Sequence, residues 1–267
     1  MLYTHVFFDL DGTLLNTAPG IKHSFQYALR ELEVPVLTEE ELDFVIGPPL
    51  FWSFHDKLGY DEATAERGVA LYREYYRPTG MWECIPYEGI PALLQALHTA
   101  GVRLGVVTGK PEEFAVKLIR HFSLEHLFDF VVGTSFSDKH AEKKELLERA
   151  FTLAGLSGEA RRGALMVGDR CFDIDGAKDV GIDSLGVLYG FGMILNFPLV
   201  SKTANSTSSM LKKPSEPITG ISNLSLFEIE RSVSLPASPN FSASGALPIP
   251  KLSRTIRNTL FLSAIIK

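Results

Sequence analysis

The sequence has few cysteines and no long apolar run. Its only two cysteines, Cys84 and Cys171, are too few for a disulfide framework or a cysteine-based zinc site. A membrane-spanning helix is not expected, because no run of about 18 uninterrupted apolar residues occurs. The opening stretch MLYTHVFFDLDGT is too short and too acidic to be a signal peptide. We therefore expect a protein of the reducing cytoplasm.

Basic residues are fewer than acidic ones, and the balance of charge changes along the chain. The net charge of −6 argues against nucleic acid as a principal partner. Residues 1–190 hold 18 Lys and Arg against 29 Asp and Glu, whereas residues 191–267 hold 8 against 3 Glu and contain no Asp. The second segment also holds 14 Ser and 7 Pro without a period. Such composition predicts a disordered or otherwise atypical tail over residues 193–267.

Apolar strands alternate with helical patterns over most of the remaining chain. The expected strands are rich in Val and Leu and nearly continuous, which is typical of parallel strands covered on both faces. They are His5–Leu10, Val102–Thr108, Phe130–Gly133, Ala164–Gly168 and Ser184–Leu188. Helical patterns occupy Pro91–Ala100, Pro111–His121 and Lys143–Ala154. This alternation predicts an α/β fold with a doubly wound parallel sheet.

The alternation is interrupted between the first two expected strands. Ile21–Leu32 and Ala63–Tyr76 are amphipathic, and Thr38 opens a probable capping box with Glu41. We therefore expect a helical cap over residues 18–85, inserted into a catalytic core formed by residues 1–17 and 86–192. Such a cap would lie over the carboxyl ends of the strands, where open α/β sheets bind ligands.

Two aspartates end the first expected strand. Asp9 and Asp11 stand at i and i+2, so their carboxylates point the same way if the backbone stays extended. Asp11-Gly12 alone would be an ordinary turn. Asp9, however, ends an apolar run, and a carboxylate there has to be desolvated or liganded.

Polar residues also follow two other expected strands. Thr108-Gly109 ends one strand where a helix N-terminus could favour an anion, although Thr108 could equally be an ordinary helix cap. Asp169 and Asp173 follow another strand, four residues apart, and one helical turn would bring them together as oxygen ligands for a hard cation. The alternative is an exposed acidic helix start. Three such strand ends together favour an active site.

These motifs resemble the haloacid dehalogenase-like (HAD) superfamily of phosphatases with a small helical cap. Asp9-Leu10-Asp11-Gly12-Thr13 is similar to its first motif, Thr108 to its second, a lysine to its third, and Gly168-Asp169 with Asp173 to its fourth. The resemblance covers roughly residues 3–192. Three further segments resemble the phosphoglycolate phosphatase and 5′-nucleotidase-like branch: Ile46–Leu50, Met166–Ala177 and Gly186–Gly192.

The third-motif lysine has three candidates, Lys139, Lys143 and Lys144. In the branch that the chain resembles, this lysine opens a helix, and the second residue after it is acidic and precedes two aliphatic residues. The segment Lys143–Leu147 fits that pattern, so we choose Lys143, with Lys144 as the alternative. Either lysine could also be solvated helix surface.

The resemblance implies a Mg²⁺-dependent phosphomonoesterase that acts on a small phosphorylated metabolite. It implies that Asp9 attacks phosphorus, forming an aspartyl-phosphate, while Asp11 serves as general acid and base. Thr108, Gly109 and Lys143 would bind the phosphoryl group. Mg²⁺ would be held by Asp9, the backbone carbonyl of Asp11, Asp169 and Asp173.

Asp11 separates some of the family's chemistries, because dehalogenases and phosphonate hydrolases of the superfamily lack an aspartate there. A sugar phosphomutase shares both carboxylates and stays an alternative. So does a weakly active or inactive phospho-acceptor or binding protein. The substrate would be set by the cap and its surroundings. Lys22, Arg73 and Lys110 are candidates for a second anionic group, and Phe51, Trp52 and Phe54 for an aromatic platform, although we favour cap core for these aromatics.

The tail departs from the branch that the chain resembles. In that branch, the segment similar to Gly186–Gly192 is followed by a helix, a strand and a closing helix, and Met193–Lys267 shows none of these patterns. We interpret this tail as an out-of-frame or otherwise aberrant C-terminus, with a natural disordered extension as the alternative.

Overall fold

The computed structural model describes residues 3–136, 142–192 and 200–201 of the chain. Five parallel strands form the central sheet in the order β5-β4-β1-β6-β7. Their bounds are β1 His5–Phe8, β4 Arg103–Pro111, β5 Phe130–Thr134, β6 Ala164–Gly168 and β7 Asp183–Gly186. The sheet confirms the predicted doubly wound α/β fold.

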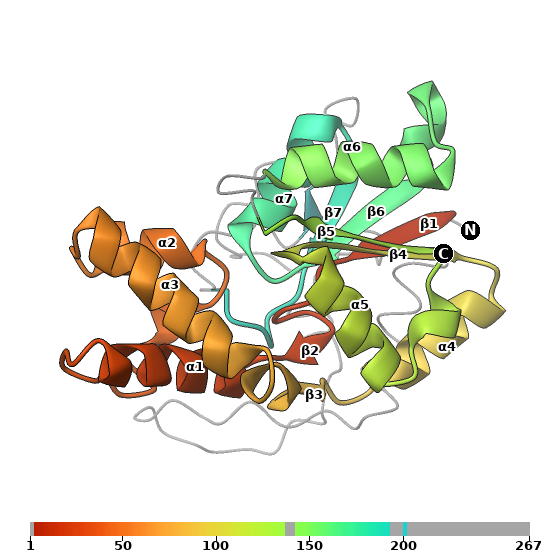
Figure 1. The fold of residues 1–267 in the computed structure, drawn as a ribbon. Helices are drawn as coiled ribbons and strands as arrows, with labels where there is room; N and C mark the ends of the chain where they lie inside the picture. The colour runs from red at the N-terminus through yellow and green to blue at the C-terminus, as the bar shows by residue number, and fades with distance from the viewer. Residues whose placement is uncertain (1–2, 137–141, 193–199, 202–267) are drawn as a thin grey trace, which may run out of the picture.

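Two layers of helices cover the sheet (Figure 1). Helices α4 (Ile90–Thr99) and α5 (Glu112–His121) pack on one face, and α6 (Lys143–Ala154) and α7 (Cys171–Val180) on the other. The alternation of side chains along β1 supplies both layers, since Val6 and Phe8 join one apolar core while Phe7 joins the other. Burial on both faces explains why these strands read as nearly continuous apolar runs.

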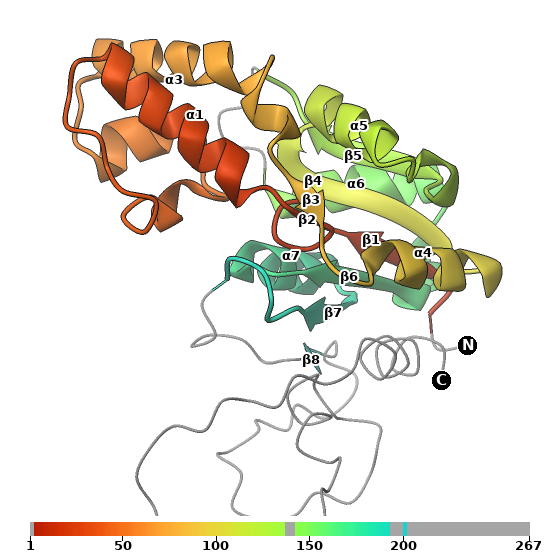
Figure 2. The ribbon, with the colours of Figure 1, turned by 90° about the horizontal axis from the view of Figure 1, so that it is seen from below.

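The cap consists of α1 (Ala18–Glu31), α2 (Leu50–Trp52) with the adjoining π-helix Ser53–Lys57, and α3 (Glu62–Tyr76). It lies beyond one end of the sheet, the end toward which the parallel strands run (Figures 1 and 2). Its core is aromatic, with the Phe25 and Phe54 rings stacked at 4.2 Å and Tyr72 edge-on to Phe25. Fully burying such side chains contributes roughly 1.5–3 kcal/mol each.

Two short antiparallel strands join the cap to the core. β2 (Leu15–Asn16) enters the cap, β3 (Ile85–Pro86) leaves it, and the two pair with each other. Strands of two residues carry no periodic signal, so they were not predicted. Short 3₁₀ helices complete the described structure at Asp43–Val45, Gly80–Trp82, Glu125–Leu127 and Gly158–Gly163.

Several local expectations differ from the structure. The helix predicted to open at Pro111 begins at Glu112, because β4 continues through Pro111 after a shift in its register with β5. The predicted atypical tail lies outside the described residues except for β8 (Val200–Ser201), which pairs antiparallel with the exposed edge of β7. The expectation of a disordered or aberrant tail stays a prediction.

Among the described residues, no helix is long and apolar enough to cross a membrane. Both cysteines are free, with Cys84 buried and Cys171 exposed.

Candidate active site

Asp9 lies where β1 ends, in the middle of the sheet. Its backbone N–H donates to the carbonyl of Val167 on the neighbouring strand at 2.9 Å, which fixes the backbone at this point. The residue is 7% exposed. Lys143 Nζ, at the start of α6, donates to Asp9 Oδ1 at 2.8 Å and to the Val107 carbonyl at 2.9 Å. A buried carboxylate and a buried ammonium therefore meet at the carboxyl edge of the sheet.

Asp169 and Asp173 come to the same place by a route that differs from the prediction. Asp169 precedes α7 and does not share a helix face with Asp173. Instead, Asp173 folds back over the helix start, where its carboxylate accepts the Arg170 backbone N–H at 3.1 Å and pairs with Lys143 Nζ at 2.7 Å. Asp173 is 1% exposed, so it is no solvated helix start. It is the buried third residue of α7, which accepts the N-cap N–H in a capping box and also faces the site.

Asp169 is held by partners on two other segments. Its Oδ1 accepts from the Thr13 hydroxyl at 3.3 Å, and its Oδ2 accepts the Phe191 backbone N–H at 2.6 Å. Gly12 leaves room for this carboxylate: its φ is +85°, and a Cβ at this position would overlap Asp169. The loop after β1 and the segment after β7 thus fix Asp169 together.

Carboxylate oxygens of Asp9, Asp169 and Asp173 lie within 4.8 Å of one another, close enough for one metal ion. Three buried carboxylates are a donor set for a hard cation such as Mg²⁺ or Ca²⁺, and their surroundings offer no soft ligand in the described chain. The residues therefore fit a divalent metal. The Asp11 carboxylate is not in this group, and the role expected for the Asp11 backbone carbonyl stays a prediction.

The three carboxylates carry more negative charge than Lys143 neutralises. Burial, together with the charges of Asp173 and Asp169, raises the pKa of Asp9 from 3.8 to about 7, although Lys143 opposes the rise. Burial and Asp173 raise the pKa of Asp169 to about 6. The pKa of Lys143 also rises, because the attraction of Asp173 and Asp9 outweighs the cost of burying its charge. A cation bound among these groups would relieve the excess.

Asp11 forms an ion pair with Lys110, a residue for which the sequence analysis had considered a different role. Lys110 Nζ contacts both carboxylate oxygens of Asp11, at 3.0 and 2.9 Å. Lys110 was considered as a partner for a second anionic group of the substrate, but in the structure its ammonium is buried against Asp11. Its position two residues after Thr108, on the same strand, was the available signal.

Thr108 and Gly109 occupy the end of β4, beside the aspartates on β1. Thr108 is buried, and its hydroxyl accepts the Lys110 backbone N–H at 3.2 Å. Gly109 is exposed and lies within the strand, so the expected helix N-terminus does not begin there. The first turn of α5 also carries Glu112 and Glu113, which disfavour an anion at that end. The phosphate roles of Thr108, Gly109 and Lys143 stay predictions.

The other substrate candidates divide between surface and core. Lys22 pairs with Asp43 at 2.6 Å, and the Arg73 guanidinium lies over the Phe136 ring. Phe54 belongs to the cap core, as favoured from the sequence. The remaining candidates are Phe51, which stacks on His55; Trp52, which is largely exposed; Lys144, which is exposed; and Lys139, which lies outside the described residues.

Arg170 is a residue of the site to which the sequence analysis gave no role. It follows Asp169, and its Nη2 donates to the Ile46 carbonyl in the cap at 2.5 Å. Its buried Nε has no hydrogen-bond partner among the described residues and lies 3.9 Å from Asp169 Oδ2. The contact joins the segment Ile46–Leu50 to the side of the core that carries Asp169. The distance of 124 residues between the partners hid it from sequence reasoning.

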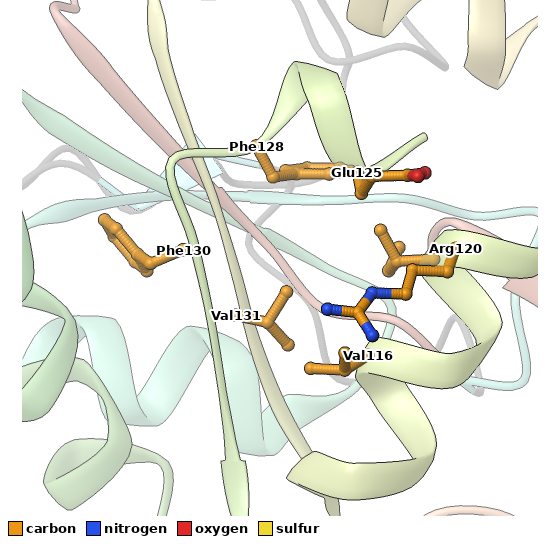
Figure 3. A pocket seen from close by; sticks show the side chains of 7 residues that line it. Val116, Arg120, Glu125, Phe128, Phe130 and Val131 are labelled. Atoms are coloured by element: carbon orange, nitrogen blue, oxygen red, sulfur yellow. The ribbon is translucent and has the colours of Figure 1, made fainter. Parts of the chain in front are cut away.

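A hollow elsewhere on the molecule is separate from this site. It has a volume of about 200 Å³ and lies beside α5 and the first residues of β5, between side chains that include Arg120, Glu125 and Val131 (Figure 3). The aspartates, in contrast, lie at the carboxyl edge of the sheet. None of them lines the hollow, so we do not assign the chemistry to it.

Comparisons with known proteins agree with this arrangement. Residues 6–187 match the family of haloacid dehalogenase-like hydrolases. The chain is 40% identical over 190 residues to a 5′-nucleotidase from Pseudomonas aeruginosa, covering 71% of this chain and 85% of the relative. It is 30% identical over 208 residues to a phosphoglycolate phosphatase from Salmonella typhimurium, covering 70% and 81%.

A solved structure with this architecture has a different name. It is the protein tyrosine kinase A (PtkA) of Mycobacterium tuberculosis, with a TM-score of 0.64 and 37% identity. The similarity covers 76% of this chain and 91% of that chain. The same scaffold thus carries proteins named for different phosphoryl-transfer reactions.

Proposed function

We propose that the protein hydrolyses phosphomonoesters of small metabolites through an aspartyl-phosphate on Asp9. The proposal starts from the family: the chain belongs to the haloacid dehalogenase-like hydrolases and is a phosphatase of that family. The observation that carries the proposal is the meeting of Asp9, Lys143, Asp169 and Asp173 in one buried group. Phosphoryl transfer needs positioning and charge neutralisation above all, and such a group supplies both.

In the proposed first step, an oxygen of Asp9 attacks phosphorus and the bond from phosphorus to the leaving oxygen breaks. Asp11 gives its proton to the leaving alkoxide. In the second step, Asp11 takes a proton from the water that attacks the aspartyl-phosphate, which returns Asp9 and releases inorganic phosphate. Lys143 Nζ contacts Asp9 and would hold a phosphoryl oxygen there, and the buried Thr108 would do the same from β4.

Asp9, Asp169, Asp173 and the Asp11 backbone carbonyl would hold Mg²⁺ in this proposal. When bound, the ion would neutralise the charge that builds up between the carboxylates and a dianionic ester. The donor set supports the choice, because carboxylate and carbonyl oxygens suit Mg²⁺. Without a cation, Asp9 would approach the ester with two further buried carboxylates beside it, and repulsion would oppose attack.

The substrate class follows from the relatives together with the cap. We propose phosphoglycolate or a 5′-nucleotide, since relatives carry those names. The second candidate function is transfer to or storage on the protein without efficient turnover, which the similarity to PtkA favours. A sugar phosphomutase is a further alternative. Efficient release of inorganic phosphate separates the proposal from all of these.

The test combines a substrate panel with trapping of the intermediate. Wild type is assayed for phosphate release from phosphoglycolate, 5′-nucleotides and a sugar phosphate, with Mg²⁺ and with EDTA. Asp11→Asn is then mixed with substrate, quenched in acid and examined by mass spectrometry. We expect a phosphorylated peptide containing Asp9, because dephosphorylation loses its base. Normal turnover by Asp11→Asn without that peptide would contradict the acid and base role.

A further inference from the structure

Lys110 is buried beside the site and belongs to none of the groups that the proposed mechanism uses. Its side chain is 5% exposed and that of Asp11 is 18% exposed. The two contacts of 3.0 and 2.9 Å engage both oxygens of the carboxylate. A carboxylate held at both oxygens has lost its freedom to rotate about its terminal bond. The orientation of Asp11 is therefore set by Lys110.

The other side of the Lys110 ammonium faces the cap. Its Nζ lies 5.2 Å from the centre of the Tyr76 ring, which is carried by the last turn of α3. Tyr76 stacks on Tyr72 at 5.3 Å and meets Phe114 of α5 edge-on at the same distance. The Tyr76 ring covers the ammonium, and its own position is fixed by a second cap tyrosine and a core phenylalanine. An ammonium over an aromatic face is attracted by the ring, more strongly where water is excluded.

The ammonium keeps its charge in this enclosure. Burial alone would lower the pKa of Lys110, but Asp11 and Tyr76 together raise it above its ordinary value. A buried charge of this kind is stable only with its partners in place, because an unpaired ammonium would pay a large desolvation cost. Lys110 is therefore tied to Asp11 from the core and to Tyr76 from the cap at the same time.

We propose that Lys110 is the positioning residue for Asp11 and that Tyr76 makes this positioning depend on the cap. The inference rests on the proposed function, in which Asp11 exchanges a proton with the leaving oxygen and with water. With the cap placed as in this structure, Lys110 turns the Asp11 carboxylate toward the site. Without Tyr76 above it, the ammonium would lose part of its enclosure and hold Asp11 less firmly.

A different role for Lys110 would be direct binding of the substrate phosphate. The geometry favours positioning, because Lys143 already contacts Asp9, whereas the Lys110 ammonium contacts Asp11 and faces an aromatic ring. The two roles predict different losses of activity on different phosphate esters. Loss of a phosphate contact slows formation of the aspartyl-phosphate from every ester. Loss of acid positioning slows that step mainly for esters whose leaving oxygen needs a proton.

The experiment compares Lys110→Met, Lys110→Arg and Tyr76→Leu with wild type on two substrates. p-Nitrophenyl phosphate has a leaving group that departs without a proton, and glycerol 2-phosphate has one that needs it. We expect Lys110→Met to lose at least about tenfold more kcat/KM on the alkyl ester than on the aryl ester, because kcat/KM reports formation of the aspartyl-phosphate, whereas kcat also includes its hydrolysis, which is common to both substrates. Lys110→Arg should recover part of that loss, and Tyr76→Leu should show the same selectivity in weaker form. Inhibition by inorganic phosphate should change less than about threefold, because the phosphate contacts remain.

Equal losses of kcat/KM on both esters, or inhibition by phosphate weakened about tenfold, would show that Lys110 binds phosphate and would overturn the proposal. Unchanged kinetics in Lys110→Met would overturn it as well. If circular dichroism shows that Lys110→Met is unfolded, the selectivity of Lys110→Arg and Tyr76→Leu between the two esters tests the proposal instead. A folded wild type that releases no phosphate from either ester would instead contradict the proposed function.

Discussion

Replacing Asp9 with asparagine is expected to stabilise the metal-free protein at neutral pH. Asp9 shares its buried position with Asp169 and Asp173, and its pKa is raised from 3.8 to about 7. At a pH between these two pKa values, the Asp9 carboxyl keeps its proton in the folded protein but has lost it in the unfolded chain. The free energy of unfolding therefore falls as the pH rises through this window.

The size of the effect follows from the pKa shift. One pKa unit is worth about 1.4 kcal/mol, so a rise from 3.8 to about 7 corresponds to an upper limit of about 4 kcal/mol at pH 8. Asparagine keeps the size of the side chain and an oxygen that Lys143 Nζ can contact. Asp9→Asn should thus match wild type near pH 4 and exceed it by a few kcal/mol at pH 8.

The assay is urea unfolding followed by circular dichroism, in EDTA, from pH 4 to 8. Asp179→Asn, which changes an exposed aspartate at the far end of α7, is the matched control and should follow wild type throughout. Mg²⁺ at 100 times the Kd should narrow the difference at pH 8 by stabilising wild type by about 2.7 kcal/mol. A difference between Asp9→Asn and wild type that does not change with pH would refute the reasoning about excess buried charge.

Three further substitutions test other parts of the structure. Arg170→Gln removes a charged hydrogen bond to the Ile46 carbonyl, which is worth about 1.5–3 kcal/mol, and should raise KM about tenfold with a smaller change in kcat. An unchanged KM in steady-state kinetics would contradict the link to the cap. Gly12→Ala should weaken metal binding, measured by calorimetry, because its Cβ would overlap Asp169 in a backbone conformation with positive φ; an unchanged Kd would argue against the close approach. Phe54→Ala should lower the free energy of unfolding by about 3–5 kcal/mol through loss of its stack on Phe25; a loss below about 1 kcal/mol in urea would contradict a packed cap core.

The sheet and the grouping of its strand-end residues followed from the sequence because they depend on local patterns. Apolar runs ending in Asp9, Thr108 and Asp169 were enough to place these residues at one edge, since parallel strands end on the same side of a sheet. The route by which Asp173 joins them was predicted wrongly. A spacing of four residues does not reveal that a side chain will cap its own helix.

The residues that the sequence analysis misplaced depend on contacts between distant segments. Lys110 contacts Asp11, which is 99 residues away in the sequence, and Arg170 contacts Ile46, which is 124 residues away. Lys110 lies where the register between β4 and β5 shifts, just before α5 begins, and neither feature has a periodic signal in the sequence. Pairing partners of buried charges therefore required the structure.

The central claim, that Asp9 is the nucleophile of a metal-dependent phosphatase, is tested most directly by phosphate release from p-nitrophenyl phosphate. Wild type and Asp9→Asn are compared in Mg²⁺ and in EDTA, each shown to be folded by circular dichroism. We expect release by wild type in Mg²⁺, almost none in EDTA, and none above background for Asp9→Asn under either condition. Turnover by Asp9→Asn at more than a trace of the wild-type rate would contradict Asp9 as nucleophile, and full activity of wild type in EDTA would contradict the role of the metal.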